Sequence, residues 1–467
     1  MEMRLESDSI GEYEVPVDAY YGVQTLRAKR NFPITQRSLR REMILSLGEI
    51  KMACALTNMD AGVLDNEKAS LIVEACKEVM DGVYDEAFIV DPIQGGAGTS
   101  TNMNANEVIA NIANKLHGDD LGSYAYIHPN DDVNKGQSTN DVYPTAGKLT
   151  ALKLVKPLIE ELSFMIDALD HKSIEFEDVF KMGRTQLQDA VPMRLGQSFH
   201  AYEEVLKRDL RRIKEASHEI EIINMGGTAI GTAINADPMY HANITRMLCY
   251  VTHEDLKSAD DLIDGTQNTD GYVVLSSALK TCAINLSKMC NDLRLLSSGP
   301  KTGLGEINLP PMQNGSSIMP GKVNPVIPEV MNQIAFHVAG NDVTIAMASE
   351  AGQMELNAFE PVLFDSLFSS LTTMTNGIRT LREHCILGIS ANKERCADLL
   401  EHSVGSVTAI CPYVGYKSAA TLAKEALKTN TPIRTVLKEH HLFDETQINE
   451  ILDVHKLTDP IHLVCKY

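Results

Sequence analysis

The sequence is short of basic residues. Its 467 residues contain 42 lysines and arginines against 63 aspartates and glutamates, so the formal net charge at pH 7 is -21. Proteins that bind the phosphates of nucleic acid, or an anionic membrane surface, need basic patches. The charge balance therefore argues against nucleic acid and membrane as partners. It does not exclude a small anionic substrate, because a few local cations are enough to set the potential inside a pocket.

Signals for export, membrane insertion and disulfide formation are also missing. No stretch approaches the roughly 20 apolar residues that a membrane span requires, and the N-terminus lacks a basic segment followed by an apolar one. The nine cysteines are odd in number and scattered, with no Cys-x-x-Cys pair and no Cys/His spacing typical of a metal site. Free thiols act as small hydrophobes inside apolar helices. We therefore expect a reducing, cytoplasmic location without disulfides.

Motifs of several common enzyme classes are absent. There is no Gly-x-Gly-x-x-Gly after a strand, no Gly-Lys-Ser/Thr ending of a phosphate-binding loop and no Gly-x-Ser-x-Gly elbow. Strand signals are weak throughout. The composition, with 44% hydrophobic and 22% charged residues, is that of a globular protein. Nucleotide-binding α/β folds and serine hydrolases are therefore disfavoured.

The dominant pattern that is present is helical. Between 275 and 296 the apolar residues alternate spacings of four and three: Leu275, Leu279, Cys282, Leu286, Met289, Leu293 and Leu296. A second stripe lies in the proline-free stretch 195–225, which as one helix would be about 45 Å long. These patterns predict long amphipathic helices. From about 395 onward the patterns are short and predict a small helical appendage.

The segment 328–353 differs, because its apolar residues cover every side of a helical projection. Its only charged residues are Glu329, Asp342 and Glu350. A helix that is apolar all round must be buried all round. The segment therefore predicts a helical core shared between subunits. The alternative is a central helix within one large monomeric domain.

Two of the polar segments that interrupt the helices have features of anion sites. Gly315–Pro325 carries two hydroxyls, one ammonium and one carboxamide between glycines and prolines, and such a loop can close over a small anion. Gln94–Glu107 leads from glycines through hydroxyls into a helix start, where free N–H groups point outward. By composition alone, an ordinary surface loop and a simple helix cap explain these segments equally well.

Two further polar segments are less distinctive. His128–Asp141 offers many donors before a helix, and a capped helix start is the default interpretation of Asn140 and Asp141. His128 is a candidate base or ligand, although a hydrogen-bonded structural histidine is the more common case. The adjacent carboxylates in this segment, without a third ligand, are weak evidence for a metal. Met182–Pro192 by itself predicts only a polar turn before a long helix.

Taken together, these segments resemble the fumarase/aspartase superfamily over nearly the whole chain, from Asp18–Thr25 to Gly388–Asn392. The loop Gly315–Pro325 is similar to the signature of that superfamily. Within it, the chain resembles the aspartases more than the class II fumarases. Gly95–Ser100 has the aspartase form, and Gln186 stands where fumarases carry histidine.

The resemblance implies a mainly α, three-domain fumarase/aspartase-type fold. The expected parts are an N-terminal domain (1–139), a central bundle of long helices (140–394) and a small C-terminal helical domain (395–467). It also implies a homotetramer whose central bundle forms the shared core. Each active site would take segments from three subunits.

The implied activity is the reversible deamination of L-aspartate to fumarate and ammonia through an aci-carboxylate intermediate, without a cofactor or a metal. Removing the proton next to the β-carboxylate places a second negative charge on that group, so fixed donors must surround it. The resemblance implies that Ser316 is the base, acting as an alkoxide. The implied substrate-binding residues are Thr99, Ser138, Thr139 and Ser317 for the β-carboxylate, Thr185, Lys322 and Asn324 for the α-carboxylate, and Asn140 and Gln186 for the amino group. The alternatives are a class II fumarate hydratase, an argininosuccinate or adenylosuccinate lyase, and a non-catalytic homologue.

Overall fold

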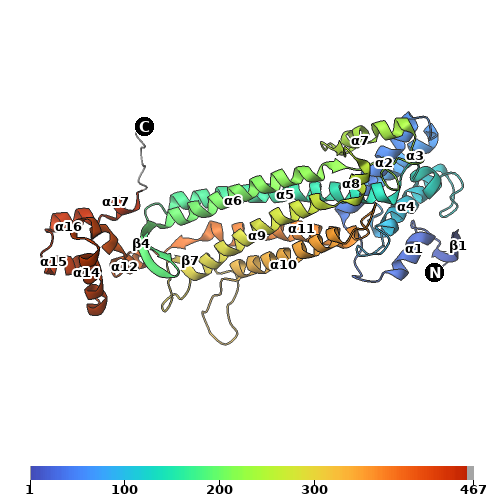
Figure 1. Cartoon of the computed structure of the whole chain (residues 1–467). Helices are drawn as coiled ribbons and strands as arrows, with labels where there is room; N and C mark the ends of the chain where they lie inside the picture. Colours follow the sequence, from blue (N-terminus) through green and yellow to red (C-terminus); the bar gives the residue numbers. More distant parts are fainter. Residues whose placement is uncertain (1, 460–467) are drawn as a thin grey trace. The chain divides into compact units, whose positions relative to one another are not determined.

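The computed structural model describes residues 2–459, and within them the chain divides into two compact units (Figure 1). The first unit comprises residues 2–160, 210–283 and 335–375. The second comprises residues 161–209, 284–334 and 376–459. This division follows the density of contacts along the chain. The three-domain boundaries implied by the family resemblance are a different division and stay a prediction.

Five long helices account for much of the fold. They are α5 (Thr139–Glu175), α6 (Leu195–Ser217), α9 (Asp270–Leu296), α10 (Val326–Glu350) and α11 (Glu360–His384), all drawn in Figure 1. The expected helices within 195–225 and 275–296 are present. The first is shorter than expected, because α6 ends at Ser217 and is followed by a 3-10 turn (His218–Ile220) and the short strand β5 (Ile222–Ile223).

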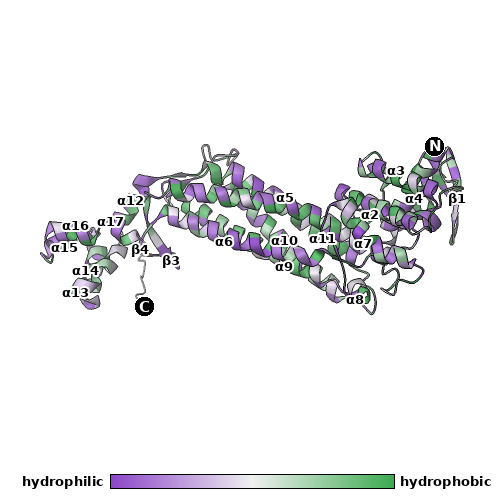
Figure 2. Cartoon of the chain, turned by 90° about the horizontal axis from the view of Figure 1, so that it is seen from above, coloured by the Kyte–Doolittle hydropathy of each residue, from purple (hydrophilic) through white to green (hydrophobic). Residues whose placement is uncertain are grey.

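The apolar stripe of α9 is buried as the spacing predicts. All seven of its residues, from Leu275 to Leu296, are at most 9% exposed, and Figure 2 shows hydrophobic residues recurring along this helix. Polar contacts join α9 to α10. In the first unit, Ser276 Oγ donates to Asp342 Oδ1 at 2.8 Å. In the second unit, Asn332 Nδ2 donates to Ser287 Oγ at 2.8 Å. Asp342 and Asn332, two of the polar residues of α10, therefore have partners on α9.

The first unit adds shorter elements. They are the antiparallel strands β1 (Met3–Asp8) and β2 (Gly11–Pro16), α1 (Val23–Asn31), α2 (Arg41–Asp60), α3 (Asn66–Met80), α4 (Thr99–His117), a π-helical turn (Pro129–Val133), α7 (Pro238–Thr252) and α8 (Leu262–Gln267). Helix α2 packs against α3, α4 and α7. Every residue from Ser46 to Ala55 is buried, so α2 is covered on all sides.

The second unit contains a β-hairpin and the C-terminal helices. Strand β3 (Phe180–Thr185) pairs antiparallel with β4 (Gln188–Arg194). The short helices are α12 (Lys393–Glu401), α13 (Cys411–Val414), α14 (Tyr416–Thr429), α15 (Ile433–Glu439), α16 (Glu445–Ile451) and α17 (Val454–Thr458). Helices α14, α15 and α16, with the 3-10 turn Gly405–Ile410, enclose a core of their own that includes Ile410, Leu422 and Leu437. The small helical appendage expected after 395 is therefore present.

Strands are few, as expected. Within residues 2–459 the strands form four two-stranded sheets, including the parallel pair β5 with β6 (Lys257–Ser258) and the antiparallel pair β7 (Ile307–Asn308) with β8 (Ser390–Ala391). No helix in this part of the chain is both long and apolar enough to cross a lipid bilayer. The eight cysteines in it are free thiols, and Cys465 lies outside the described residues.

Helix α10 has one face that a single chain leaves exposed. Met331, Ala335, Val338 and Ile345 are buried on its inner side. On the outer side a row of exposed residues follows spacings of three and four: Gln333, Phe336, Gly340, Val343, Met347 and Glu350. Phe336 is 68% exposed, and Val343 and Met347 are each 62% exposed. Burial on every side, which the sequence predicts for this helix, therefore requires a cover that one chain does not supply.

Candidate active site

The start of α4 is set by an unusual backbone. Gly96, Ala97 and Gly98 all have positive φ, at 89°, 54° and 86°, a region that disfavours side chains. A Cβ at Gly98 would lie 2.2 Å from Cγ of Tyr143, so only glycine fits. This turn leads directly into Thr99, whose exposed side chain begins the helix and donates from Oγ1 to the carbonyl oxygen of Gly96 at 2.8 Å.

The start of α5 is capped in both directions. Ser138 Oγ accepts from the backbone N–H of Asn140 at 3.2 Å, and the backbone N–H of Ser138 donates to Asp141 Oδ1 at 2.9 Å. The expected capping role of Asp141 is present. Its second oxygen also accepts from the N–H groups of Gly226 and Thr228, at 3.1 and 3.0 Å. Burial raises the pKa of Asp141 to about 6. The segment Ser138–Asn140 is thus held at a fixed position.

The two helix starts are hydrogen-bonded to each other. Asn102, in the first turn of α4, donates from Nδ2 to Thr139 Oγ1 at 3.1 Å. The hydroxyl hydrogen of Thr139 can therefore be donated to a ligand. Asn140 donates from Nδ2 to the carbonyl oxygen of Ala229 at 2.8 Å, which orients its amide and leaves its Oδ1 able to accept. The first turn of α4, which starts at Thr99, and the segment Ser138–Asn140 thus form one polar cluster in the first unit.

The loop Gly315–Pro325 in the second unit folds back on itself. Asn324 donates from Nδ2 to the carbonyl oxygen of Gly315 at 2.8 Å. A Cβ at Gly315 would lie 1.8 Å from the carbonyl oxygen of Lys322, so the close approach of the two loop ends requires glycine. Ser317 and Lys322 are exposed within this closed loop.

Ser316 has a distinctive environment inside the same loop. Its Oγ accepts from two backbone N–H groups, those of Ile318 at 3.2 Å and Met319 at 3.1 Å. Two donors aimed at one hydroxyl oxygen favour negative charge on that oxygen. The side chain is only partly covered. Ser316 Oγ is therefore the acceptor of two backbone hydrogen bonds from its own loop.

Thr185 and Gln186 lie at the tip of the β3–β4 hairpin. Gln186 and Leu187 form its turn with positive φ, at 52° and 62°, and the side chains of Thr185 and Gln186 are exposed. The end of β3 next to this turn is held by the fully buried carboxylate of Glu306, which pairs with Arg184 Nη1 at 2.8 Å. The sequence predicted only a polar turn here. The strands were missed because they are short and not clearly alternating.

The ten predicted site residues thus fall into two groups. Thr99, Ser138, Thr139 and Asn140 belong to the first unit, and Thr185, Gln186, Ser316, Ser317, Lys322 and Asn324 belong to the second. All ten side chains are at least partly exposed. Most of their fixed hydrogen bonds are to backbone groups of nearby segments. Each group therefore presents polar atoms to a ligand or to another chain.

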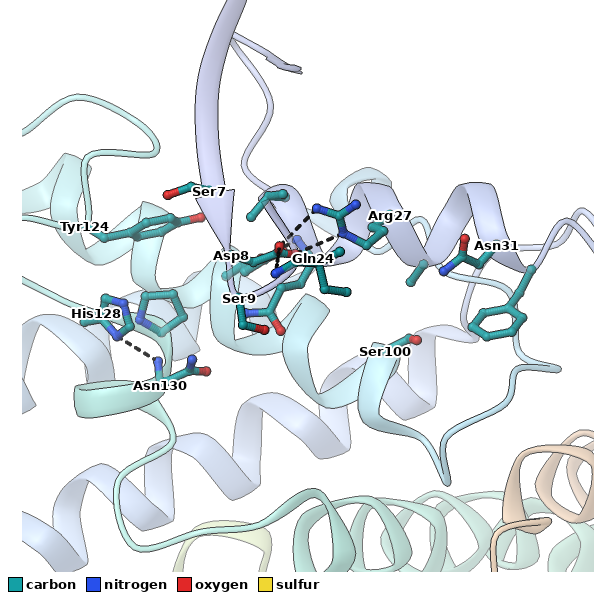
Figure 3. A pocket seen from close by; sticks show the side chains of 16 residues that line it. Ser7, Asp8, Ser9, Gln24, Arg27, Asn31, Ser100, Tyr124, His128 and Asn130 are labelled. Atoms are coloured by element: carbon teal, nitrogen blue, oxygen red, sulfur yellow. Dashed lines mark hydrogen bonds and ion pairs between the residues drawn. The ribbon is translucent and has the colours of Figure 1, made fainter. Parts of the chain in front are cut away.

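A cavity of about 420 Å³ in the first unit reaches the first turn of α4, and its charged side chains Asp8, Arg27 and Glu107 already have partners (Figure 3). Ser100 lines it, whereas none of the ten predicted residues does. Arg27 pairs with Asp8 at 3.0 Å. Glu107 accepts four hydrogen bonds from the N-terminal end of α1. His128 Nδ1 accepts from the N–H groups of Asn130 and Asp131, so this nitrogen caps the turn that follows it.

The comparison with known proteins identifies the family. The family described as "Lyase" matches residues 11–340, and the one described as "Fumarase C C-terminus" matches residues 407–459. This chain belongs to the lyase family. The lyase is 54% identical to an aspartate ammonia-lyase of a Bacillus species, over 98% of both chains. It is 49% identical to the aspartate ammonia-lyase of Bacillus subtilis (strain 168), over 98% of this chain and 97% of the relative.

Solved structures agree with the expected fold. A structure described as fumarate lyase:delta crystallin from Brucella melitensis, bound to cobalt, superposes with a TM-score of 0.96 at 46% identity, covering 98% of this lyase and 100% of that chain. A class II fumarase from Schistosoma mansoni gives a TM-score of 0.95 at 34% identity, with the same coverage. The predicted membership in the fumarase/aspartase superfamily and its mainly α fold are confirmed.

Two buried residues near the first group were missed by sequence reasoning. Lys51 lies in the apolar centre of α2 and is fully buried, and Asn102 in α4 is 1% exposed. Asn102 is one of three asparagines that alternate along Asn102–Asn106. The available signals were a lone cation within a mostly apolar helical stretch, and a run of amides at a helix start that no surface role explains.

Proposed function

We propose that this lyase eliminates ammonia from L-aspartate to give fumarate, in a reversible reaction that needs no cofactor. The observation that carries the proposal is the identity of 54% and 49% to aspartate ammonia-lyases over almost the full length of both chains. The class II fumarase is less similar, at 34% identity. The eight free cysteines of the described residues support a reducing, cytoplasmic location.

The difficult step is removal of a weakly acidic proton from the carbon next to the β-carboxylate. We assign Ser316 as the base. A hydroxyl can act as a base only when its alkoxide is stabilised, and the N–H groups of Ile318 and Met319 already point at Ser316 Oγ. Lys322, in the same loop, adds a positive charge that favours the alkoxide. The hydrogen bonds to Ser316 are the support for this assignment.

The intermediate needs donors at the β-carboxylate, where the second negative charge develops. Ser138 and Thr139 suit this role, because each hydroxyl oxygen accepts a hydrogen bond from the protein and can donate its hydrogen to the substrate. Ser317 would donate to it from the loop Gly315–Pro325. Thr99 would also donate, but its hydroxyl hydrogen now points at the carbonyl oxygen of Gly96, so it must rotate when substrate binds.

The remaining groups of the substrate match the remaining side chains. We assign Lys322, Asn324 and Thr185 to the α-carboxylate, because an ammonium, an amide and a hydroxyl can all donate to it. Asn140 and Gln186 are assigned to the amino group that leaves. The Oδ1 of Asn140 is oriented for this purpose by the hydrogen bond from its own Nδ2 to Ala229.

The proposal includes a homotetramer whose sites combine segments from three subunits. The exposed apolar face of α10, with Phe336, Val343 and Met347, supports self-association. Its spacings of three and four are those of helices that pack against one another. A mixing experiment tests the shared site. Inactive Ser316→Ala and Thr99→Ala proteins, dissociated and reassembled together, should regain activity, because some sites then receive both intact segments from different chains.

The function is tested by mixing the purified protein with L-aspartate and following the ultraviolet absorbance of fumarate, with L-malate in a parallel assay. We expect fumarate from aspartate and little or none from malate. Ser316→Ala should lower turnover by about 10²–10⁴, as is typical for loss of a general base. Ser297→Ala, a serine just after α9 whose hydroxyl donates to the carbonyl oxygen of Arg294, is the control and should keep normal turnover. Faster hydration of fumarate than amination at high ammonia would assign the protein to the fumarases instead.

A further inference from the structure

Lys51 in α2 is a buried cation without an ion-pair partner among residues 2–459. Its side chain is 0% exposed. The ammonium donates instead to two neutral amide oxygens, Asn134 Oδ1 at 2.9 Å and Gln137 Oε1 at 2.8 Å. Taking an ammonium out of water is costly when no carboxylate pairs with it. A lysine kept in such a place needs an explanation other than stability.

The hydrogen bonds of Lys51 lead to the candidate site. Asn134 Oδ1 also accepts from Asn102 Nδ2 and from Asn106 Nδ2, each at 3.2 Å. The same Nδ2 of Asn102 donates to Thr139 Oγ1 at 3.1 Å. Three successive contacts therefore connect the ammonium of Lys51 to a hydroxyl assigned to the β-carboxylate.

Among the described residues, the ionisable groups around Lys51 are a carboxyl, two thiols and a phenol, and none of these is a cation. Asp141 of α5 is the nearby carboxylate, and its oxygens are occupied by three backbone N–H groups. Burial raises the pKa of Cys54 in α2 to about 12, and it also raises the pKa values of Cys76 in α3 and Tyr240 in α7, so these three groups are neutral. Burial lowers the pKa of Lys51 to about 8, so the ammonium is mostly charged at pH 7.

We propose that Lys51 is a positioning residue for the elimination, acting on the substrate through Asn134, Asn102 and Thr139. It has two effects. It fixes the amide of Asn134, which in turn orients Asn102 and leaves the Thr139 hydroxyl with its hydrogen directed outward. Its buried charge also favours the second negative charge that develops on the β-carboxylate in the transition state. The inference rests on the proposed function, because it concerns the carboxylate of that reaction.

The size of the charge effect follows from Coulomb's law. The three contacts put Thr139 Oγ1 within about 10 Å of the ammonium. At that separation and an effective dielectric constant of about 20, one unit charge changes the stability of another by a factor of about 15. Loss of the charge should therefore lower turnover by about 15-fold, and by more where Thr139 also loses its orientation.

The test compares three variants of the full-length protein by steady-state kinetics with aspartate between pH 6 and pH 10. Lys51→Met keeps the apolar stem and removes the charge. It should lower kcat by about 15-fold. In the wild type, deprotonation of Lys51 should make kcat fall above about pH 8, and this fall should be absent in Lys51→Met. Lys51→Arg keeps the charge at all these pH values, so the fall attributed to Lys51 should be absent over this range while kcat stays near that of the wild type at pH 7.

Lys148→Met is the matched control. Burial also lowers the pKa of Lys148 to about 8, but its Nζ donates to the carbonyl oxygen of Ile222 and the described contacts do not link it to Thr139. This variant should keep both kcat and the alkaline fall. A general effect of losing a lysine whose pKa is lowered would appear in both methionine variants, whereas the proposed effect appears only in Lys51→Met.

The outcomes separate the two ideas. A wild type that converts aspartate, together with a Lys51→Met variant indistinguishable from Lys148→Met, overturns the inference and leaves the proposed function standing. A wild type that does not convert aspartate overturns the proposed function and this inference with it.

Should circular dichroism show Lys51→Met to be unfolded, Asn102→Ala decides, because it breaks only the last part of the path. It should lower kcat/KM about tenfold, and an unchanged value counts against the inference.

Discussion

Replacing Val343 by glutamate should prevent assembly of the subunits. Val343 lies in the middle of the exposed face of α10 and is 62% exposed in a single chain. Complete burial of such a side chain contributes roughly 1.5–3 kcal/mol, so covering the exposed part contributes about 1–2 kcal/mol per chain. A glutamate loses this contribution, and burying its carboxylate costs several kcal/mol more. A total near 5 kcal/mol per chain corresponds to more than a thousandfold weaker association.

The assay is size-exclusion chromatography with light scattering, combined with the fumarate assay on the same fractions. We expect Val343→Glu to give smaller species without activity, because the proposed sites need segments from several chains. Val83→Glu is the matched control, since it makes the same substitution at a valine that is 63% exposed in the turn after α3. It should assemble normally. A Val343→Glu protein of wild-type mass and activity would refute the reasoning, as would a fully active wild-type monomer.

Three further predictions concern the site and the core. Lys322→Ala should raise KM for aspartate sharply, since the α-carboxylate is present in both ground and transition states. It should also lower kcat if the same charge favours the Ser316 alkoxide. Normal saturation by aspartate would contradict the assignment. Gln186→His should not create efficient hydration of fumarate, because a titrating side chain at one position does not by itself bind and polarise water; appreciable malate formation by this variant would disprove the prediction. Burial raises the pKa of Glu360 to about 8, above its ordinary 4.5. The contribution of its protonated form to stability is therefore fully present below about pH 4.5 and is lost as pH rises toward 8. Glu360→Gln should therefore raise the thermal midpoint at pH 8 more than at pH 5, and equal changes at the two pH values in differential scanning calorimetry would count against this explanation.

The sequence by itself predicted the elements whose signal is local. The alternating spacing of apolar residues in α9 depends only on helical geometry, and all seven of these residues are buried. The glycines at 96 and 98 and the hydroxyls that follow them predicted a helix start, and α4 begins at Thr99. The loop Gly315–Pro325 was recognised by residue type and order, because a short closed loop uses neighbours in sequence. For the same reason its resemblance to a family was specific.

Only the tertiary structure decided which distant side chains touch. Nothing in the residues around Lys51 predicts that its ammonium meets Asn134 and Gln137, more than 80 positions later, because that contact depends on how α2 packs against α3, α4 and α7. The pairing of Arg184 with the buried Glu306 is likewise a product of packing. The exposed face of α10 is a third case. Its sequence is apolar all round. Only the folded chain shows which face of α10 is covered by neighbouring helices and which face stays exposed, because burial depends on neighbours and not on residue type.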